Sequence, residues 1–265
     1  MKPAPFAYAR PKDWSEALKL VAAGARPGAG TQSLGPLLNL RLAQPDTIAD
    51  LRHLPDYAGV ALAGGVARIG AGTTHAAIED GAVPGRLGEI MAGIARCIAY
   101  RPVRNRGTIG GSLAHADPAA DWVAVLPALG ATAIVLGPRG ERRIPTAGFV
   151  TGIFETALAA DELLRAVELP LLPAEARWGH WKFCRKVGEF SKATACVLAL
   201  PGGAPRAVLA ALDAPPLVIE DARVLMADPV AEASRLLDGI PGLTAWRRAI
   251  AGTALRRAVE LAGAA

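Results

Sequence analysis

Three glycines, two hydroxyl residues and two carboxylates stand close together between Arg104 and Asp121. The stretch runs Arg-Asn-Arg-Gly-Thr-Ile-Gly-Gly-Ser-Leu-Ala-His-Ala-Asp-Pro-Ala-Ala-Asp. Glycines let backbone N–H groups approach an anion closely because they have no Cβ. A carboxylate a little further along can accept hydrogen bonds from a ribose or an adenine amine. The pattern indicates a nucleotide with a pyrophosphate, although a lone Gly-Gly is more often only a sharp structural turn. A Walker-type nucleotide site is excluded, because no Gly-Lys-Ser/Thr follows.

Two more turns in the N-terminal half combine glycine with hydroxyl side chains, at residues 28–33 and 70–74. The first begins like a dinucleotide fingerprint, but Ser33 stands where the third glycine belongs and no long strand pattern precedes it, which disfavours a Rossmann fold. Its polar trio, Thr31, Gln32 and Ser33, suits a phosphate cradle better. With the turn at 107–112, the pattern predicts one extended anionic ligand, whose sugar or adenine groups Asp117 and Asp121 would contact.

A catalytic set of side chains is missing from the sequence. Neither a Cys–His nor a Ser–His–Asp arrangement has a distinctive spacing, and no His-Glu-x-x-His metal motif occurs. His75 could touch a ligand, but a histidine in this place is more often a helix-start residue at a surface. If the chain belongs to an enzyme, we expect a bound cofactor to do the chemistry.

Composition and charge narrow the class of protein. The 265 residues are 52% hydrophobic and 20% charged, which fits a globular chain of one large or two modest domains. The net charge of +5 is spread along the chain without a basic run, which argues against nucleic-acid binding. The cysteines Cys97, Cys184 and Cys196 lack the spacing of zinc or iron–sulfur ligands and are expected to be small buried hydrophobes. With no secretory signal and no long apolar run, we expect a cytoplasmic protein without a membrane span.

The periodicity of apolar residues predicts a mixed α and β chain. We expect helices from the cap at Asp13 to Gly24, after the 28–33 turn, and at 75–80, 87–99, 119–129 (interrupted at Pro127), 230–237 and 246–262. We expect strands at 47–51, 59–62, 67–70, 131–136, 141–144, 162–170, 207–212 and 217–219. Residues 193–200 suit either a strand or a helix. A linker near 172–176 would separate a small C-terminal antiparallel sheet covered by helices.

Four motifs resemble one known family. Thr108-Ile-Gly-Gly-Ser-Leu-Ala-His-Ala-Asp-Pro-Ala-Ala-Asp121 is similar to the Thr-Ile-Gly-Gly-Asn…Pro…Asp motif of the FAD-binding medium subunits of molybdenum hydroxylases, the family of xanthine dehydrogenase and aerobic carbon monoxide dehydrogenase. The stretches 28–34 and 69–75 resemble that family's other two glycine signatures. Residues 182–190 resemble the start of its C-terminal domain. The order and spacing agree over nearly the whole chain.

The resemblance implies an α+β fold with a two-lobed, vanillyl-alcohol-oxidase-like FAD-binding domain at 1–174, its lobes at roughly 1–55 and 56–174. A small α+β domain, an antiparallel sheet with helices, would follow at 175–265. The cofactor would be FAD. The first turn would wrap the pyrophosphate, Asp121 would hold the ribose or adenine end, and Lys182 would lie near the isoalloxazine, where a cation stabilises negative charge on the reduced flavin. Phe190 stands where an aromatic residue is sometimes found close to the ring.

The cofactor-binding residues implied in this way share small size, hydroxyl groups or charge. They are Arg26, Pro27, Gly28, Ala29, Gly30, Thr31, Gln32, Ser33, Leu34, Gly72, Thr73, Thr108, Gly110, Gly111, Ser112, Ala114, Asp117, Asp121, Leu164 and Lys182.

The chain departs from the family pattern at three places. The paired glycines of the first turn become Ala29-Gly30, and the usual asparagine of the third turn is Ser112. Gly188-Glu-Phe190 replaces the acidic run of the eukaryotic xanthine enzymes. These changes leave FAD binding in place but do not identify the electron acceptor.

The resemblance also implies a role and partners. Electrons from an oxidation at molybdenum would pass through [2Fe-2S] clusters on a small partner subunit to FAD here, and then to NAD, a quinone, oxygen or another carrier. A large partner subunit would hold the molybdenum cofactor, in a dimer of heterotrimers. Two other readings stay open: a free-standing small FAD-dependent oxidoreductase with its own substrate pocket, and a non-enzymatic nucleotide-binding module.

Overall fold

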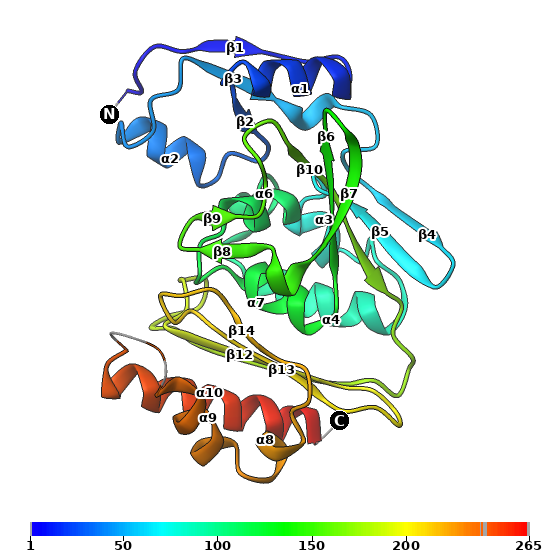
Figure 1. Ribbon diagram of the computed structural model, residues 1–265, viewed down its shortest axis with the longest axis vertical. Helices are drawn as coiled ribbons and strands as arrows, with labels where there is room; N and C mark the ends of the chain where they lie inside the picture. The colour runs from blue at the N-terminus through cyan, green and yellow to red at the C-terminus, as the bar shows by residue number, and fades with distance from the viewer. Residues whose placement is uncertain (1, 239, 241–242, 264–265) are drawn as a thin grey trace.

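The chain folds into three layers stacked along its longest axis, as the computed structural model shows (Figure 1). The structure describes residues 2–238, 240 and 243–263. A small N-terminal sheet lies at one end, a five-stranded sheet with helices occupies the middle, and a four-stranded sheet backed by helices lies at the other end (Figure 1). The α+β class expected from the sequence is confirmed.

The N-terminal layer is a three-stranded parallel sheet in the order β1-β3-β2. Its strands are β1 (Ala7–Ala9), β2 (Arg26–Gly28) and β3 (Thr47–Asp50), and its helices are α1 (Trp14–Ala22), α2 (Leu34–Asn39) and the 3₁₀ turn η1 (Leu51–His53). Helix α1 begins where the sequence predicts, because the Asp13 carboxylate accepts a hydrogen bond from the Glu16 N–H at 2.8 Å. The helix expected after the 28–33 turn is confirmed by α2, and the short strand β2 precedes that turn.

The middle layer is an antiparallel sheet in the order β4-β5-β10-β6-β7. Its strands are β4 (Val60–Ala63), β5 (Val66–Gly70), β6 (Thr132–Gly137), β7 (Gly140–Pro145) and β10 (Leu163–Pro170). The Gly64-Gly65 turn between β4 and β5 has positive φ at both residues, 55° and 77°, as a two-residue hairpin requires. A small hairpin, β8 (Val150–Gly152) and β9 (Glu155–Thr156), and the 3₁₀ turn η2 (Thr146–Gly148) complete this layer.

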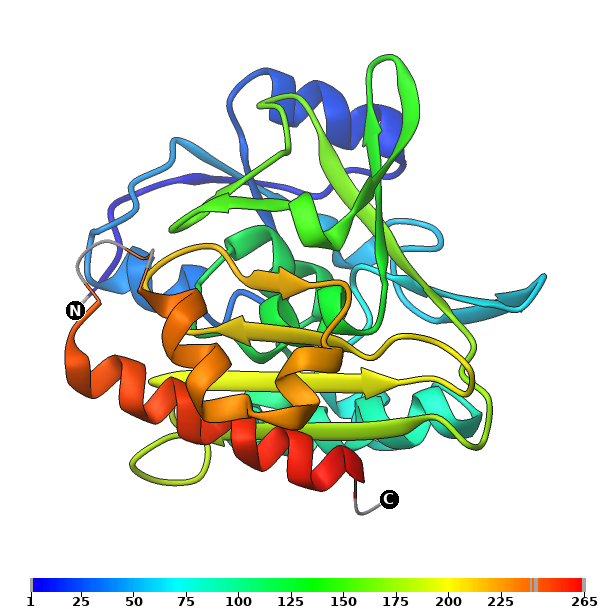
Figure 2. The same cartoon turned by 60° about the horizontal axis from the view of Figure 1, so that its bottom comes forward.

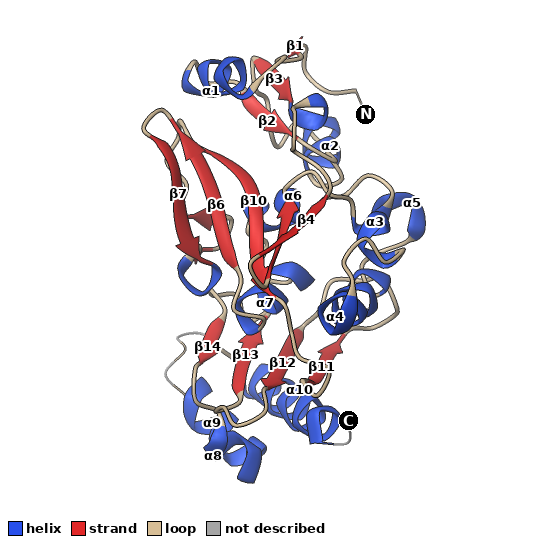
Figure 3. Ribbon diagram, turned by 90° about the vertical axis from the view of Figure 1, so that its right-hand side faces the viewer, coloured by secondary structure: helices blue, strands red, loops and turns tan. Residues whose placement is uncertain are grey.

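Five helices belong to the middle layer: α3 (His75–Glu79), α4 (Gly85–Arg96), α5 (Arg101–Arg104), α6 (Ile109–His115) and α7 (Asp121–Ala128). Helix α7 is buried along its whole length beyond its first residue, and it lies between the middle sheet and the C-terminal sheet (Figure 3). The predicted interruption at Pro127 is wrong. Pro127 sits in the last turn, and the helix continues to Ala128.

The C-terminal layer is an antiparallel sheet of β11 (Arg177–Phe183), β12 (Ala193–Ala199), β13 (Arg206–Ala210) and β14 (Leu217–Ile219). Residues 193–200, left open by the sequence, therefore form a strand. Helices α8 (Arg223–Ala227), α9 (Pro229–Leu237) and α10 (Ala245–Gly263) cover its outer face (Figure 2). Side chains of β12 alternate: Cys196 and Leu198 join the core around α7, whereas Ala195 and Val197 join the core beneath α10.

Gly179 permits the closest approach between α10 and the C-terminal sheet. A Cβ at this position would lie 1.8 Å from the Ala258 carbonyl oxygen. Strand β11 is thus held against α10 by backbone contact, while its other face looks toward α4 and α7. Across the described part of the chain, no helix has the length and apolar character to cross a membrane.

Candidate functional site

The second and third glycine turns are joined by backbone hydrogen bonds. The His75 N–H donates to the Gly107 carbonyl at 2.9 Å, and the Ile109 N–H donates to the Thr73 carbonyl at 3.0 Å. The Gly110 N–H donates to the Ala71 carbonyl at 2.9 Å. Two segments more than thirty residues apart in sequence are therefore locked into one frame.

The first turn closes onto this frame at Gly30. A Cβ on Gly30 would lie 1.9 Å from the Arg106 carbonyl oxygen and 2.8 Å from the Gly107 Cα, so only glycine allows the two turns to touch. The Ala29 methyl group lies 3.7 Å from where a Cβ of Gly111 would be. All three turns singled out in the sequence thus meet in space.

The first turn keeps its backbone donors free. Within the described residues, the N–H groups of residues 29–33 have no hydrogen-bond acceptor. Thr31 has φ of 57°, a left-handed conformation that is strained for a β-branched residue, and such strain concentrates at functional sites. The Gln32 side-chain amide donates to the Gly30 carbonyl at 3.0 Å. This bond holds the turn through a carbonyl oxygen and leaves its backbone N–H groups unused. A row of free N–H groups on a held turn suits phosphate oxygens.

The other two turns have used most of their backbone donors; among the described residues, only the N–H groups of Thr74 and Thr108 have no acceptor there. The Gly72 N–H bonds to Tyr57, the Gly110 N–H to Ala71 and the Gly111 N–H to the Thr108 hydroxyl. The buried Thr73 hydroxyl exchanges hydrogen bonds with the backbone of Gly59. This differs from the expectation that all three turns offer donors to one ligand. The reason is that most donors of the second and third turns bond to each other, to their own turn or to neighbouring backbone such as Tyr57.

His75 is buried rather than exposed, so the expectation of a surface position is wrong. Only 5% of it is accessible, because Trp122 of α7 covers it and donates its indole N–H to His75 Nδ1 at 3.1 Å. Burial, aided by the charge of Arg104, lowers the pKa of His75 to about 4. The imidazole is therefore neutral near pH 7 and serves as a hydrogen-bond acceptor in the core.

Arg104 anchors the start of the third turn. Its guanidinium forms a two-pronged ion pair with the Glu79 carboxylate, at 2.7 and 3.1 Å, and also donates to the Ile98 and Ala99 carbonyls. With all of these partners, a nine-tenths buried arginine is well satisfied and holds α3 against α5.

Asp121 and Lys182 form a buried ion pair that joins α7 to β11. Lys182 Nζ lies 2.9 Å from Asp121 Oδ1 and also 2.9 Å from the Cys97 carbonyl oxygen, and each side chain is only 10% exposed. Burial raises the pKa of the Asp121 carboxyl, and the Lys182 ammonium opposes that rise. The resemblance assigned these residues to different ends of FAD. Since the two side chains touch, they cannot lie at opposite ends of an extended cofactor.

The remaining predicted residues are scattered around the frame. Asp117 accepts a hydrogen bond from the Ala119 N–H at 2.9 Å, as a cap before Pro118 would. Leu164 is buried in β10, while Phe190 is 63% exposed. Around the first turn and α6, Arg26 and Ala114 are exposed, whereas Pro27, Leu34 and Ser112 are half-buried.

One residue near the first turn was not singled out in the sequence. The His115 ring, at the end of α6, lies 5.0 Å from the Phe154 ring, and its pKa is lowered by burial. The charges of Asp117 and Arg26 also reach it. The sequence signal that could have identified His115 is its position inside the glycine-rich stretch 104–121.

Comparison with known proteins identifies the family of the chain. Residues 4–172 match the family model described as the FAD binding domain in molybdopterin dehydrogenase. The chain is 35% identical to the carbon monoxide dehydrogenase medium chain of Afipia carboxidovorans, over 100% of this chain and 99% of that protein. It is 36% identical to the nicotine 6-hydroxylase medium subunit of Paenarthrobacter nicotinovorans, over 75% and 70% respectively. The fold matches a reconstituted CO dehydrogenase from Oligotropha carboxidovorans with a TM-score of 0.89 and 32% identity, covering 100% of this chain and 99% of that one.

Gly30→Ala should separate the first turn from the frame, because its methyl group would clash with the Arg106 carbonyl. We expect a loss of about 1–3 kcal/mol in the free energy of unfolding, together with loss of bound flavin. Urea unfolding and flavin content after gel filtration measure the two effects. The matched control is Gly35→Ala in α2, where a Cβ meets no atom within 4 Å. Equal flavin content in the two variants would contradict the assignment of the first turn to the flavin site.

His75 should make the chain sensitive to acid. Its folded pKa of about 4 lies below the ordinary value of 6.5, so the neutral form stabilises the fold fully above pH 6.5. This contribution, about 3 kcal/mol, should be lost as the pH falls from 6.5 to 4. In urea titrations across this range, His75→Gln should flatten the decline of the free energy of unfolding. If the free energy of unfolding falls with pH equally in His75→Gln and the wild type, His75 is not the source of the acid sensitivity.

Replacing one partner of the Asp121–Lys182 pair should lower the free energy of unfolding more than replacing both partners. Lys182→Met strands a buried carboxylate and should destabilise the chain by about 3–5 kcal/mol, and adding Asp121→Asn should restore much of that loss. Arg223→Met, which breaks an exposed ion pair with Asp221, serves as the control and should change little. Additive losses in the double-mutant cycle would show that the pair is not coupled.

Proposed function

The chain belongs to the family of FAD-binding domains of molybdopterin dehydrogenases, and on that premise we propose that it is the electron-transfer subunit of a molybdenum-containing hydroxylase complex. As a flavoprotein oxidoreductase subunit it carries FAD, like its medium-chain relatives. Electrons from [2Fe-2S] clusters on a partner subunit reach this chain and leave it for an external acceptor. The chain itself then needs only to bind and tune the cofactor.

The observation that carries the proposal is the row of free N–H groups at residues 29–33. A pyrophosphate presents several anionic oxygens, and consecutive backbone donors without a partner on a strained, held turn suit such a group. Gly111 of the third turn lies opposite Ala29, and we place the hydroxyl residues of the same turn, Thr108 and Ser112, beside the phosphates. The residues present therefore fit FAD at its phosphate groups.

Bound FAD would supply two-electron redox chemistry at its isoalloxazine ring. Lys182 then has a specific task. Its ammonium is buried, held by Asp121 and the Cys97 carbonyl, and kept in one position at the junction of α7 and β11. A fixed cation next to the flavin would favour its reduced, more negative form. Asp121 in this arrangement positions Lys182 and moderates its charge.

The partners follow from the names of the relatives. Medium chains and medium subunits imply a small and a large companion. We place the [2Fe-2S] clusters on the small subunit and the molybdenum cofactor on the large one, in a dimer of heterotrimers in the cytoplasm. The division at 174/175 into an FAD-binding domain and a C-terminal domain belongs to the same proposal.

Expression of the chain alone tests the proposal. We expect a yellow protein that retains FAD through gel filtration, is reduced by dithionite and turns over no organic substrate. The control is Gly30→Ala, which should be colourless although the chain is still produced. Substrate turnover by the isolated chain would instead indicate a free-standing oxidoreductase, and a colourless wild-type chain that takes up no FAD would indicate a nucleotide-binding module without redox function.

A further inference from the structure

The strand β11 forms a free edge of the C-terminal sheet. The order β11-β12-β13-β14 gives β11 one neighbour, and over the described residues its other edge pairs with no strand. An edge strand presents unpaired N–H and C=O groups, which proteins usually guard with charges, prolines or a very short strand. The outer strand β7 is guarded in this way, because Glu141, Arg142 and Arg143 are exposed on it. Strand β11 has seven residues and no proline, and its lysine is buried against Asp121, so its edge is open to pairing.

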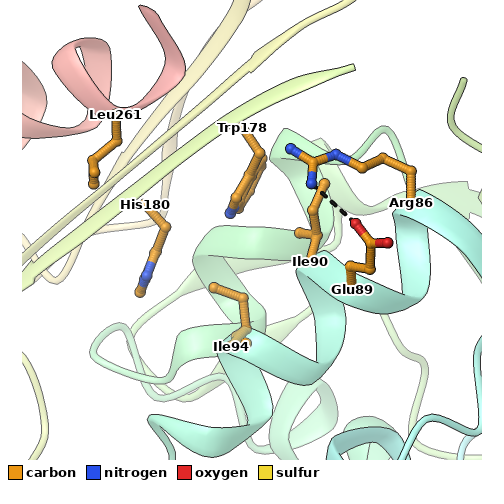
Figure 4. Close-up of a pocket in the computed structure, with 8 residues that line it drawn as sticks. Arg86, Glu89, Ile90, Ile94, Trp178, His180 and Leu261 are labelled. Carbon is orange, nitrogen blue, oxygen red and sulfur yellow. Dashed lines mark hydrogen bonds and ion pairs between the residues drawn. The ribbon is translucent and has the colours of Figure 1, made fainter. Parts of the chain in front are cut away.

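An open hollow of about 320 Å³ lies along this free edge (Figure 4). Ile90 and Ile94 of α4 line it together with Trp178 of β11, on the face of the sheet that looks toward α4. Leu261 of α10 also lines it, although α10 covers the opposite face of the sheet. Because residues from both faces line the hollow, it extends around the edge of the sheet. An apolar side chain on a strand that pairs with β11 would reach it.

The other face of the edge carries an aromatic ring and two arginines. Gly179 lies against Ala258 of α10, so Arg177 and Trp181, two residues to either side of Gly179, point to the same face. The indole of Trp181 is 41% exposed. The guanidinium carbon of Arg257, on α10, lies 5.8 Å from the centre of that ring. A strand added to the edge would therefore meet cations on the α10 side and the apolar hollow on the α4 side.

Two arginines beside this edge lack a counter-charge. Arg177 begins β11, and Arg96 lies three residues beyond Gly93, a residue of α4 that lines the hollow, so Arg96 and Gly93 share a face of the helix. Both arginines are exposed, and neither forms an ion pair in the part of the chain that the structure describes. The other charges that line the hollow, Arg86 and Glu89, pair with each other at 3.1 Å.

The charge along this edge stays positive when its carboxylates are counted. Arg256 and Arg257 of α10 share one partner, Glu260, and the exposed Glu175 lies two residues before β11. A second copy of the chain would bring two positive edges together, which is unfavourable, whereas an acidic segment would be attracted. The charge therefore favours an acidic segment of a different chain.

We propose that β11 pairs with an extended segment of a companion subunit in which apolar and acidic residues alternate. The backbone of the segment continues the sheet, its apolar side chains enter the hollow beside Trp178, and its carboxylates face Arg177 and Arg257 on the α10 side. The inference rests on the proposed function only in taking the partner to be a companion subunit. It does not involve the FAD cradle.

Peptide binding to the full chain tests this edge. The probe is a fluorescently labelled octapeptide of alternating glutamate and valine, and the matched probe has lysine for each glutamate. We expect saturable binding of the acidic peptide by fluorescence anisotropy, slower amide exchange at residues 177–183, and no binding of the lysine peptide. Arg177→Glu should weaken the acidic peptide about fivefold, whereas Arg139→Glu, the same change on the exposed turn between β6 and β7, should stay within about twofold of the wild type.

Two further changes separate strand pairing from attraction by charge alone. Gly93→Phe fills the hollow from an exposed helix position where a Cβ meets no atom within 4 Å, so it should fold, keep its flavin content and lose the peptide. Peptides N-methylated at every valine or at every glutamate place their methyl groups on opposite edges of the strand, so only one of the two should bind. The proposal is overturned if the acidic peptide does not saturate, if Gly93→Phe binds it like the wild type, or if the two methylated peptides bind equally.

Hydrogen exchange in the assembled complex identifies the natural occupant. In the complex purified through a tag on this chain, residues 177–183 should exchange more slowly than in the isolated chain, and unchanged exchange would overturn the proposal. A chain that binds the acidic peptide but takes up no FAD would count against the proposed function and leave the pairing edge supported.

Discussion

The backbone hydrogen bonds between the second and third glycine turns are the constraint on which the candidate site depends. They use the N–H groups of His75, Ile109 and Gly110, and they build a rigid floor of main chain. Gly30 then rests on that floor at a distance that permits no side chain. As a consequence, the three similar turns have different structural roles. Two turns form a frame, and the first has five consecutive N–H groups without an acceptor among the described residues, as an anion site would need.

Helix α7 connects this frame to the C-terminal sheet. It is apolar on every side after Asp121 because sheets cover two of its faces, and its Trp122 supports His75 beneath the second turn. Its first residue, Asp121, reaches β11 through Lys182. A displacement of the C-terminal sheet would therefore be transmitted to the glycine turns through the Asp121–Lys182 ion pair and α7.

Local patterns in the sequence were enough for most of the elements. The Asp13 cap, the Gly64-Gly65 hairpin and the alternating strands follow from local chemistry, and the family motifs imply FAD. Local patterns were insufficient where distant segments compete for the same groups. Whether the N–H of Gly110 faces a phosphate or Ala71 depends on a contact almost forty residues away. The burial of His75, the pairing of Asp121 with Lys182 and the continuation of α7 past Pro127 are likewise set by tertiary packing.

Amide hydrogen exchange with and without FAD tests the central claim most directly. In the FAD-free chain, the amides of residues 29–33 should exchange rapidly, because they have no acceptor, whereas those of residues 109–111 should already be protected. On addition of FAD, protection should appear at residues 29–33 and change little at 109–111. New protection confined to 109–111, with residues 29–33 still exchanging rapidly, would contradict the assignment of the first turn as the pyrophosphate cradle.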